Sequence, residues 1–128
     1  MNERYLFRGK HADTGEWIIG YYAFIEMDGD HIINVYDRIP PERYVKPETI
    51  GQCTGQRGKD GRLIFEGDIV DTDRGAGIVK WHDKGLTGWL IEFSDHRLLM
   101  ESKREYEVIG NVHDNPELLR AEGSEEEE

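Results

Sequence analysis

Residues 51–70, Gly-Gln-Cys-Thr-Gly-Gln-Arg-Gly-Lys-Asp-Gly-Arg-Leu-Ile-Phe-Glu-Gly-Asp-Ile-Val, are the stretch that decides the fold. They predict a strand, a tight turn, a second short strand, and a sharp bend into a third strand. The dipeptide Asp60-Gly61 readily supplies the positive φ angles that hairpin turns need. Gly67 provides the second bend, shortly before the apolar residues that start at Ile69. We expect this stretch to begin a β-structure that the rest of the chain completes.

The sequence after residue 70 alternates between apolar and polar residues with a period of two, which is typical of half-buried strands. Turn clusters rich in Gly, Asp and Ser separate the alternating runs. The predicted strands are five, starting at residue 69 and continuing with residues 77–82, 86–93, 97–101 and 106–112. Five short strands with tight turns favour a small SH3-like β-barrel over a sandwich. The alternation also predicts that the aromatic side chains Trp81, Trp89 and Tyr106 lie in the core.

The sequence before residue 51 predicts an N-terminal β-hairpin or sheet extension. Residues 4–9, 17–25 and 31–36 are rich in aromatic and β-branched residues, which favour strands over helices. Prolines then interrupt the pattern over residues 37–48, and residues 47–49 are expected to form a single helical turn.

The predicted organisation is one domain over residues 1–120. It comprises an N-terminal β part at about residues 1–46, a barrel part at about 47–113 and a short helix at 115–120. Asn115 or Asp114 can cap this helix, and Pro116 suits its first position. Residues 121–128 contain five glutamates and little to bury, so we expect a disordered acidic tail.

The net charge of −11 counts against a simple nucleic-acid binder, which needs lysines and arginines to displace counterions from phosphates. Removing the five glutamates of residues 121–128 leaves a charge of −6 on the rest of the chain. An acidic surface promotes solubility, and it also favours a basic partner.

The sequence predicts a cytoplasmic location. It contains one cysteine, Cys53, which excludes an internal disulfide framework and suits a reducing compartment. No apolar run approaches the roughly 20 residues that a membrane helix requires. Residues 1–8 also lack the hydrophobic region of a signal peptide.

The residues that bind metals or act as nucleophiles do not form a familiar motif. The five histidines are His11, His31, His82, His96 and His113. A zinc site would have to combine His82, Asp83, His96 and His113 from separate loops, and exposed turn histidines are the simpler interpretation. A single Cys in an apolar strand is usually a small core residue, so we expect Cys53 to be buried rather than catalytic. No cofactor or metal is predicted.

Two small groups of charged residues are candidate sites. Glu66 and Asp68 lie two residues apart and could serve acid–base chemistry, although such carboxylates more often accept backbone hydrogen bonds in a turn. Arg57, Lys59 and Arg62 form a basic hairpin tip that could bind a nucleic-acid strand, with aromatic side chains stacking on bases.

The chain resembles the YopX protein family of phages and prophages. The resemblance is carried by residues 47–52, 54–55, 59–61, 64–70 and 106–119, and it extends to residues 7–10, 15–17 and 20–21. Three residues depart from the family pattern: Gln56 stands where an aliphatic residue is usual, Gly58 replaces a more polar turn residue, and Cys53 lies where an aromatic residue is common. The resemblance implies an SH3-like β-barrel and a phage or prophage origin in a bacterial host. It implies no activity, because the family has no established catalytic residues to carry over.

We therefore expect a non-catalytic protein-interaction module that binds a host or phage protein. A nucleic-acid-binding small barrel is the alternative, and an enzyme that uses Glu66 and Asp68 is a second alternative. Self-association into a homo-oligomer is plausible, because residues 17–25 expose more apolar surface than a small sheet covers.

Overall fold

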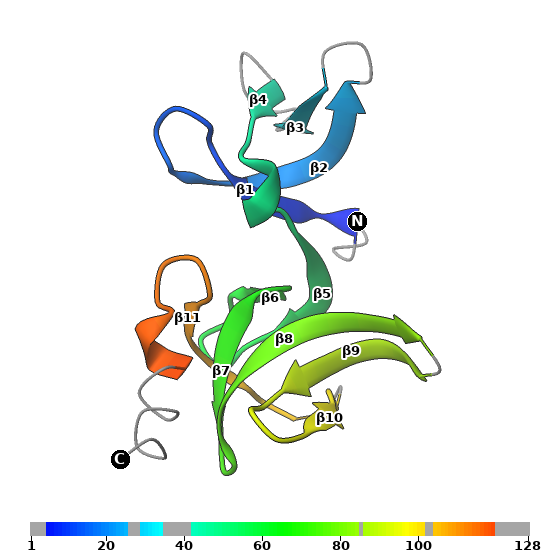
Figure 1. Ribbon diagram of the computed structural model, residues 1–128, viewed down its shortest axis with the longest axis vertical. Helices are drawn as coiled ribbons and strands as arrows, with labels where there is room; N and C mark the ends of the chain where they lie inside the picture. The colour runs from blue at the N-terminus through cyan, green and yellow to red at the C-terminus, as the bar shows by residue number, and fades with distance from the viewer. Residues whose placement is uncertain (1–4, 26–28, 35–41, 85, 102–103, 120–128) are drawn as a thin grey trace. The chain divides into compact units, whose positions relative to one another are not determined.

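The computed structural model describes residues 5–25, 29–34, 42–84, 86–101 and 104–119, and these residues form two antiparallel sheets (Figure 1). The prediction of a mainly β protein is confirmed. The chain divides into two compact units, Met1–Gly55 and Gln56–Glu128. The division falls inside one strand, whereas the sequence suggested a boundary near residue 47. The irregular connection predicted over residues 37–48 lies partly outside the described residues.

The first unit is built on the predicted N-terminal strands. It contains β1 (Phe7–Lys10), β2 (Trp17–Ile25), β3 (Asp30–Asn34), β4 (Glu42–Tyr44) and the start of β5 (Gly51–Arg57), in the sheet order β4-β3-β2-β1-β5. The pairs β1–β2, β1–β5, β2–β3 and β3–β4 are all antiparallel. Strands that follow one another in the sequence pair from β1 to β4, whereas β5 follows β4 in the chain but pairs with β1 at the other end of this order.

The predicted helical turn is a 3-10 helix, η2 (Pro47–Thr49). It is fixed to β1 through one side chain. The Thr49 hydroxyl donates to the Lys46 carbonyl (2.6 Å) and accepts from the Lys10 N–H (2.8 Å). Proline at the first helical position costs nothing, because that N–H has no partner within a helix.

The second unit begins with the hairpin that the sequence predicts. The end of β5 turns into β6 (Leu63–Phe65), and the Gly58 N–H donates to the Arg62 carbonyl at 2.9 Å. Gly61 has a φ of +86° in this turn, and Gly67 has a φ of +94° in the next. Both values lie in the left-handed region that glycine adopts without steric cost.

Five further strands complete the second unit: β7 (Asp68–Thr72), β8 (Gly75–Lys84), β9 (Leu86–Glu92), β10 (Arg97–Leu99) and β11 (Glu107–Asn111). Their order in the sheet is β10-β9-β8-β7-β11, so the last strand returns to pair with the first. All five were predicted, with ends that differ by a few residues. Figure 1 shows β8 and β9 as a long curved hairpin.

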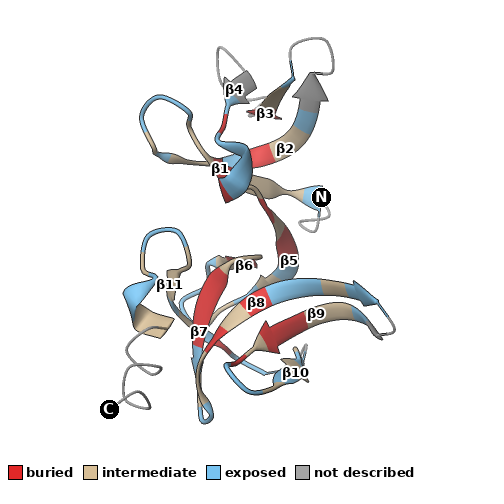
Figure 2. Cartoon of the chain, in the orientation of Figure 1, coloured by how far each residue is buried: buried red, intermediate tan, exposed pale blue. Residues whose placement is uncertain are grey.

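The core of the second unit joins strands β6 to β9 with the segment before β11. Its buried members are Ile64, Val70, Val79, Ile91, Phe93 and Tyr106. The buried stretches of β7 and β9 are visible in Figure 2. One position of β8 must remain a glycine, because a Cβ atom on Gly77 would lie 2.4 Å from Ile91 Cγ2.

Trp81 corrects the prediction of a buried aromatic side chain. It is 45% exposed, whereas Val79 on the same face of β8 is fully buried. Its main aromatic contact is Trp89 directly across the β8–β9 hairpin, with ring centroids 5.2 Å apart in an edge geometry. The alternation was right, but β8 extends beyond the part of the sheet that the core covers. Trp89 is half-buried against the core, and Tyr106 is buried as predicted.

The predicted C-terminal helix is present as a helical turn at residues 117–119. Asn115 acts differently from the predicted cap, since its Oδ1 accepts from the Asn111 N–H (3.2 Å) and so closes the turn that precedes the helix. Residue 120 and the predicted acidic tail lie outside the described residues.

Candidate functional site

The two carboxylates proposed for acid–base chemistry lie at the turn between β6 and β7. Asp68 is 3% exposed, and its Oδ2 accepts the Phe65 N–H at 2.8 Å. Gly67 between them donates its N–H to the Val79 carbonyl (2.8 Å). These contacts favour the structural interpretation of Asp68, because a carboxylate that satisfies a buried amide stabilises the turn it closes. Glu66 is half-buried beside it.

The predicted basic hairpin tip exists, and contacts within the tip engage its two arginines. Arg57 Nη1 donates to the Gly61 carbonyl at 2.6 Å, and Arg62 Nε lies 3.0 Å from Asp60 Oδ2. Lys59 is exposed, and its backbone N–H donates to the Tyr106 carbonyl (2.9 Å). The tip therefore offers less free positive charge to a phosphate backbone than its sequence indicates.

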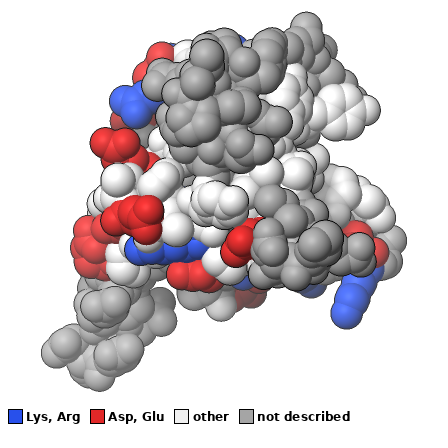
Figure 3. Space-filling model, turned by 90° about the horizontal axis from the view of Figure 1, so that it is seen from above, with Lys and Arg blue, Asp and Glu red and all other residues white. Residues whose placement is uncertain are grey.

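The distribution of charge in space agrees with this. In Figure 3, described acidic side chains lie beside the visible lysine and arginine side chains. Lys80 Nζ of β8 lies 2.8 Å from Glu92 Oε1 across the β8–β9 hairpin. A nucleic-acid surface requires clustered cations, and acidic neighbours reduce the positive charge that these side chains offer.

The predicted metal and nucleophile candidates lie on different elements. His82 is in β8, His96 in the turn before β10 and His113 in the turn after β11. Within the described residues, no group of three or more His, Cys, Asp or Glu side chains is placed to hold a metal ion. Cys53 is fully buried in β5, as predicted.

A pocket that the sequence did not predict lies in the second unit, beside strand β10. Its volume is about 310 Å³. The apolar part of its lining is Ile91, Phe93, Leu98, Leu99 and Tyr106. The polar part is Thr72, Asp73, Glu101 and Arg104. Three of the apolar residues also belong to the core cluster, so the pocket opens onto the core itself.

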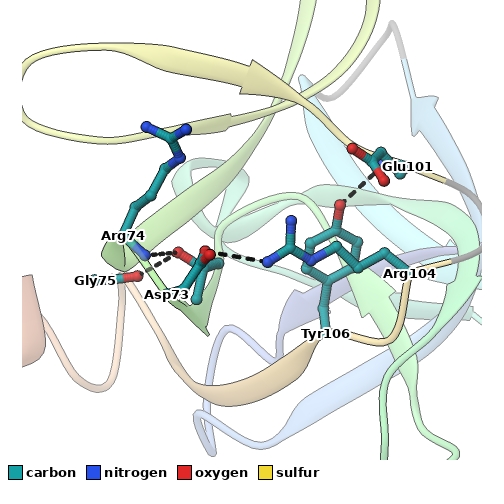
Figure 4. A network of polar contacts seen from close by, with 7 residues as sticks. Asp73, Arg74, Gly75, Glu101, Arg104 and Tyr106 are labelled. Carbon is teal, nitrogen blue, oxygen red and sulfur yellow. Dashed lines mark hydrogen bonds and ion pairs between the residues drawn. The ribbon is translucent and has the colours of Figure 1, made fainter.

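An ion pair and a stacked cation form the polar rim (Figure 4). Arg104 Nη2 lies 3.2 Å from Asp73 Oδ1, joining the β7–β8 turn to the segment before β11. The same guanidinium lies over the Tyr106 ring, 5.7 Å from its centroid. The Tyr106 hydroxyl accepts a hydrogen bond from the Glu101 N–H (2.9 Å). This bond and the guanidinium over its face both position the Tyr106 ring. A partly exposed ion pair contributes about 0–1 kcal/mol to stability, which leaves it free to rearrange around a ligand.

Gln56 supports this rim from β5. Its side-chain amide donates to the carbonyls of Glu101 (3.1 Å) and Arg104 (3.2 Å). In the sequence, Gln56 stands out only because an aliphatic residue is usual at this position in the family that the chain resembles. An aliphatic side chain cannot donate either hydrogen bond, so both bonds depend on the glutamine.

A histidine–aspartate pair lies beside the pocket. The His96 ring stacks on Phe93 with centroids 4.6 Å apart, and its Nδ1 lies 2.6 Å from Asp95 Oδ1. The hydrogen bond and the charge of His96 lower the pKa of Asp95 below its usual value. The stack places His96 against a ring that lines the pocket.

The pocket residues come from four separate segments, which is why the sequence gave no pattern for them. The one local signal is the spacing of Arg104 and Tyr106, since residues two apart share a side of an extended chain. That spacing predicts a cation above an aromatic ring. It does not reveal the ion pair with Asp73, which lies 31 residues away.

The chain combines an antiparallel β-fold with a small apolar pocket whose rim is charged. It belongs to the YopX protein family, whose model matches residues 6–120. The resemblance recognised in the sequence is thereby confirmed. No curated protein matches the chain. Among the described residues, helices are too short and polar for any to cross a bilayer.

Proposed function

We propose that this protein is a non-catalytic interaction module of phage or prophage origin that binds a host or phage protein in the bacterial cytoplasm. The observation that carries the proposal is the pocket beside β10. Its lining combines core side chains with a few polar groups, the composition that binding sites share. At about 310 Å³ it matches a side chain of a partner better than a large cofactor.

The second unit is proposed to be an SH3-like small barrel. The sheet order β10-β9-β8-β7-β11 supports this, because a four-strand meander whose fifth strand returns to the first is already curved toward closure. The buried cluster that strands β6 to β9 share also supports it. Small barrels of this kind bind ligands at their loops and at incompletely paired strand edges.

The contacts of the alternative sites support a binding role over the other two candidates. Asp68 is engaged by a backbone amide, which argues against the acid–base pair with Glu66. The arginines of the hairpin tip are engaged by Asp60 and Gly61, which argues against the nucleic-acid surface. Neither set of contacts involves the pocket.

Self-association remains part of the proposal and is attributed to β2. Ile19 in this strand is 46% exposed and belongs to the apolar run of residues 17–25. Light scattering of the full chain and of an Ile19→Lys variant tests it. A monomer at all concentrations for both proteins contradicts self-association.

Site-specific photo-crosslinking in the host cell tests the interaction role. A photoreactive amino acid replaces Leu99, which is 50% exposed and lines the pocket. The matched control places it at Ile109, a residue of β11 that is 38% exposed and outside the pocket lining. We expect a discrete protein adduct from position 99 and a much weaker one from position 109.

The absence of a protein adduct from both positions contradicts the proposal. A gel-shift experiment at low salt with single- and double-stranded DNA and RNA is run in parallel. Retardation that is lost on Lys59→Ala substitution, without protein adducts, would replace the interaction role with nucleic-acid binding at the hairpin tip.

A further inference from the structure

Strand β10 offers an outward-facing backbone next to the pocket. It ends the sheet order, and its only partner strand among the described residues is β9. The Phe93 N–H donates to the His96 carbonyl, and the Met100 N–H donates to the Trp89 carbonyl. In antiparallel pairing, these bonds make Leu99 a non-hydrogen-bonded partner of Leu90, so the Leu99 N–H and carbonyl point away from β9. An added strand would pair with these two groups.

The pocket lies where the side chains of an added strand would point. Leu98 packs against the core and Leu99 is exposed, and both line the pocket. A strand placed along the outer side of β10 directs alternate side chains to the core face and to solvent. A large apolar side chain on its core-facing side would meet the apolar lining, with Phe93 and Tyr106 as the aromatic surfaces.

The charges around the pocket favour a basic occupant. Two carboxylates, Asp73 and Glu101, face one guanidinium in the lining, and Arg104 is already paired with Asp73. The three charged residues of the lining, Asp73, Glu101 and Arg104, therefore carry a net charge of −1. The net charge of −11 attracts basic partners over a longer range.

We propose that this edge and pocket bind an extended segment of a partner protein that adds as a strand to β10, inserts one large apolar side chain and carries lysine or arginine beside it. The inference rests on the proposed interaction role and specifies its partner. Main-chain hydrogen bonds supply affinity in this recognition mode, and the pocket supplies specificity. The arginine–aspartate rim opens to admit the side chain, and Glu101 receives its basic neighbour.

Fluorescence polarisation with labelled hexapeptides and the full chain tests this directly. The probe peptide contains one internal phenylalanine, and threonine and lysine alternate at its other positions. One control peptide replaces phenylalanine with serine, and a second replaces each lysine with glutamate. We expect saturable binding of the probe, with both controls weaker by about tenfold or more, because each control peptide loses one kind of contact with the pocket and a tenfold change corresponds to about 1.4 kcal/mol.

Two variants separate the edge from the pocket charge. Leu99→Pro removes the outward N–H while leaving the bonds to β9, a position where edge strands tolerate proline. Leu99→Ala is its matched control, because it shortens the same side chain and keeps the N–H. We expect Leu99→Pro to weaken probe binding about tenfold relative to Leu99→Ala. Glu101→Gln changes an exposed residue and should fold even if Leu99→Pro does not. We expect it to weaken probe binding about two- to fivefold.

Equal binding of the probe and both control peptides overturns the inference, as does equal affinity of the two Leu99 variants when both are folded. Absence of peptide binding also overturns it. If the chain instead dimerises and Leu99→Pro abolishes the dimer, the edge serves a second copy and the inference is wrong. A protein adduct from the crosslinking experiment alongside any of these results leaves the interaction role standing and rejects only this partner.

Discussion

The core of the second unit is closed on one side and open on the other, and the same two residues face both sides. Toward β8, Ile91 and Phe93 meet Gly77 so closely that an added Cβ would lie 2.4 Å and 3.0 Å from their nearest atoms. Toward β10, the same side chains line a pocket of about 310 Å³. The core is therefore closely packed toward β8 and borders open space toward β10.

This difference distinguishes residues that specify the fold from residues available for binding. On the closed side, a single methyl group should be costly, because surrounding atoms cannot move apart without strain. On the open side, exchange of a side chain should change stability little, because the space is already present.

Ile64→Ala should produce the largest loss of stability. Ile64 is fully buried in the core cluster, so the substitution removes buried methyl groups and leaves a cavity. The expected loss in the free energy of unfolding is about 2–5 kcal/mol. Urea unfolding measures it, and Leu99→Ala on the open side is the control, with an expected change of about 0.5 kcal/mol or less. Similar losses for both variants would remove the distinction between the two sides.

Gly77→Ala should cost about 1–3 kcal/mol, because its methyl group overlaps Ile91. The same denaturation experiment measures this loss. Thr87→Ala in β9 is the control, since Thr87 is exposed and tolerates the change. A neutral Gly77→Ala variant would mean that β8 and β9 are not packed as closely as described.

Gln56→Leu should affect the open side selectively. It removes both hydrogen bonds to the carbonyls of Glu101 and Arg104 and restores an aliphatic side chain at this position. We expect a loss of about 1 kcal/mol or less in stability and faster hydrogen exchange at the Arg104 and Tyr106 amides. Unchanged exchange at these amides would show that Gln56 does not hold the rim.

His96→Gln should have the smallest effect, confined to the titration of Asp95. The histidine lowers the pKa of the Asp95 carboxyl, so the pair contributes stability above the unfolded-state pKa of Asp and loses it as pH falls through the folded-state pKa. NMR titration of the Asp95 carboxyl should give a higher pKa in the variant, and an unchanged value would contradict the contact.

The sequence predicted the strands and turns well because these depend on local chemistry. The turns at Gly61 and Gly67 follow from the conformational freedom of glycine, and both have positive φ. The 3-10 turn follows from Pro47, and the five strands of the second unit follow from alternation. Trp81 was misplaced because alternation gives the face of a strand but not how far the core extends along it.

The candidate site could not be predicted, since no local pattern specifies an empty space. The pocket depends on where β10 ends relative to Tyr106 and on an ion pair between Asp73 and Arg104, which are distant in the sequence. The sequence instead emphasised charged residues that are close together, such as Glu66 with Asp68. In the structure, the Asp68 carboxylate accepts a hydrogen bond from the Phe65 N–H within the turn. Asp68 therefore lies close to Glu66 because both belong to this turn.

Methyl NMR of the full chain titrated with the phenylalanine–lysine hexapeptide tests the difference between the two sides most directly. The methyl signals of Ile91, Leu98 and Leu99 should shift and saturate with added peptide. The signals of Ile64 and Val70, which are fully buried and outside the pocket lining, should remain in place. Shifts of similar size at all five residues, or no shift at the pocket methyls, would contradict a core that is closed on one side and open to a ligand on the other.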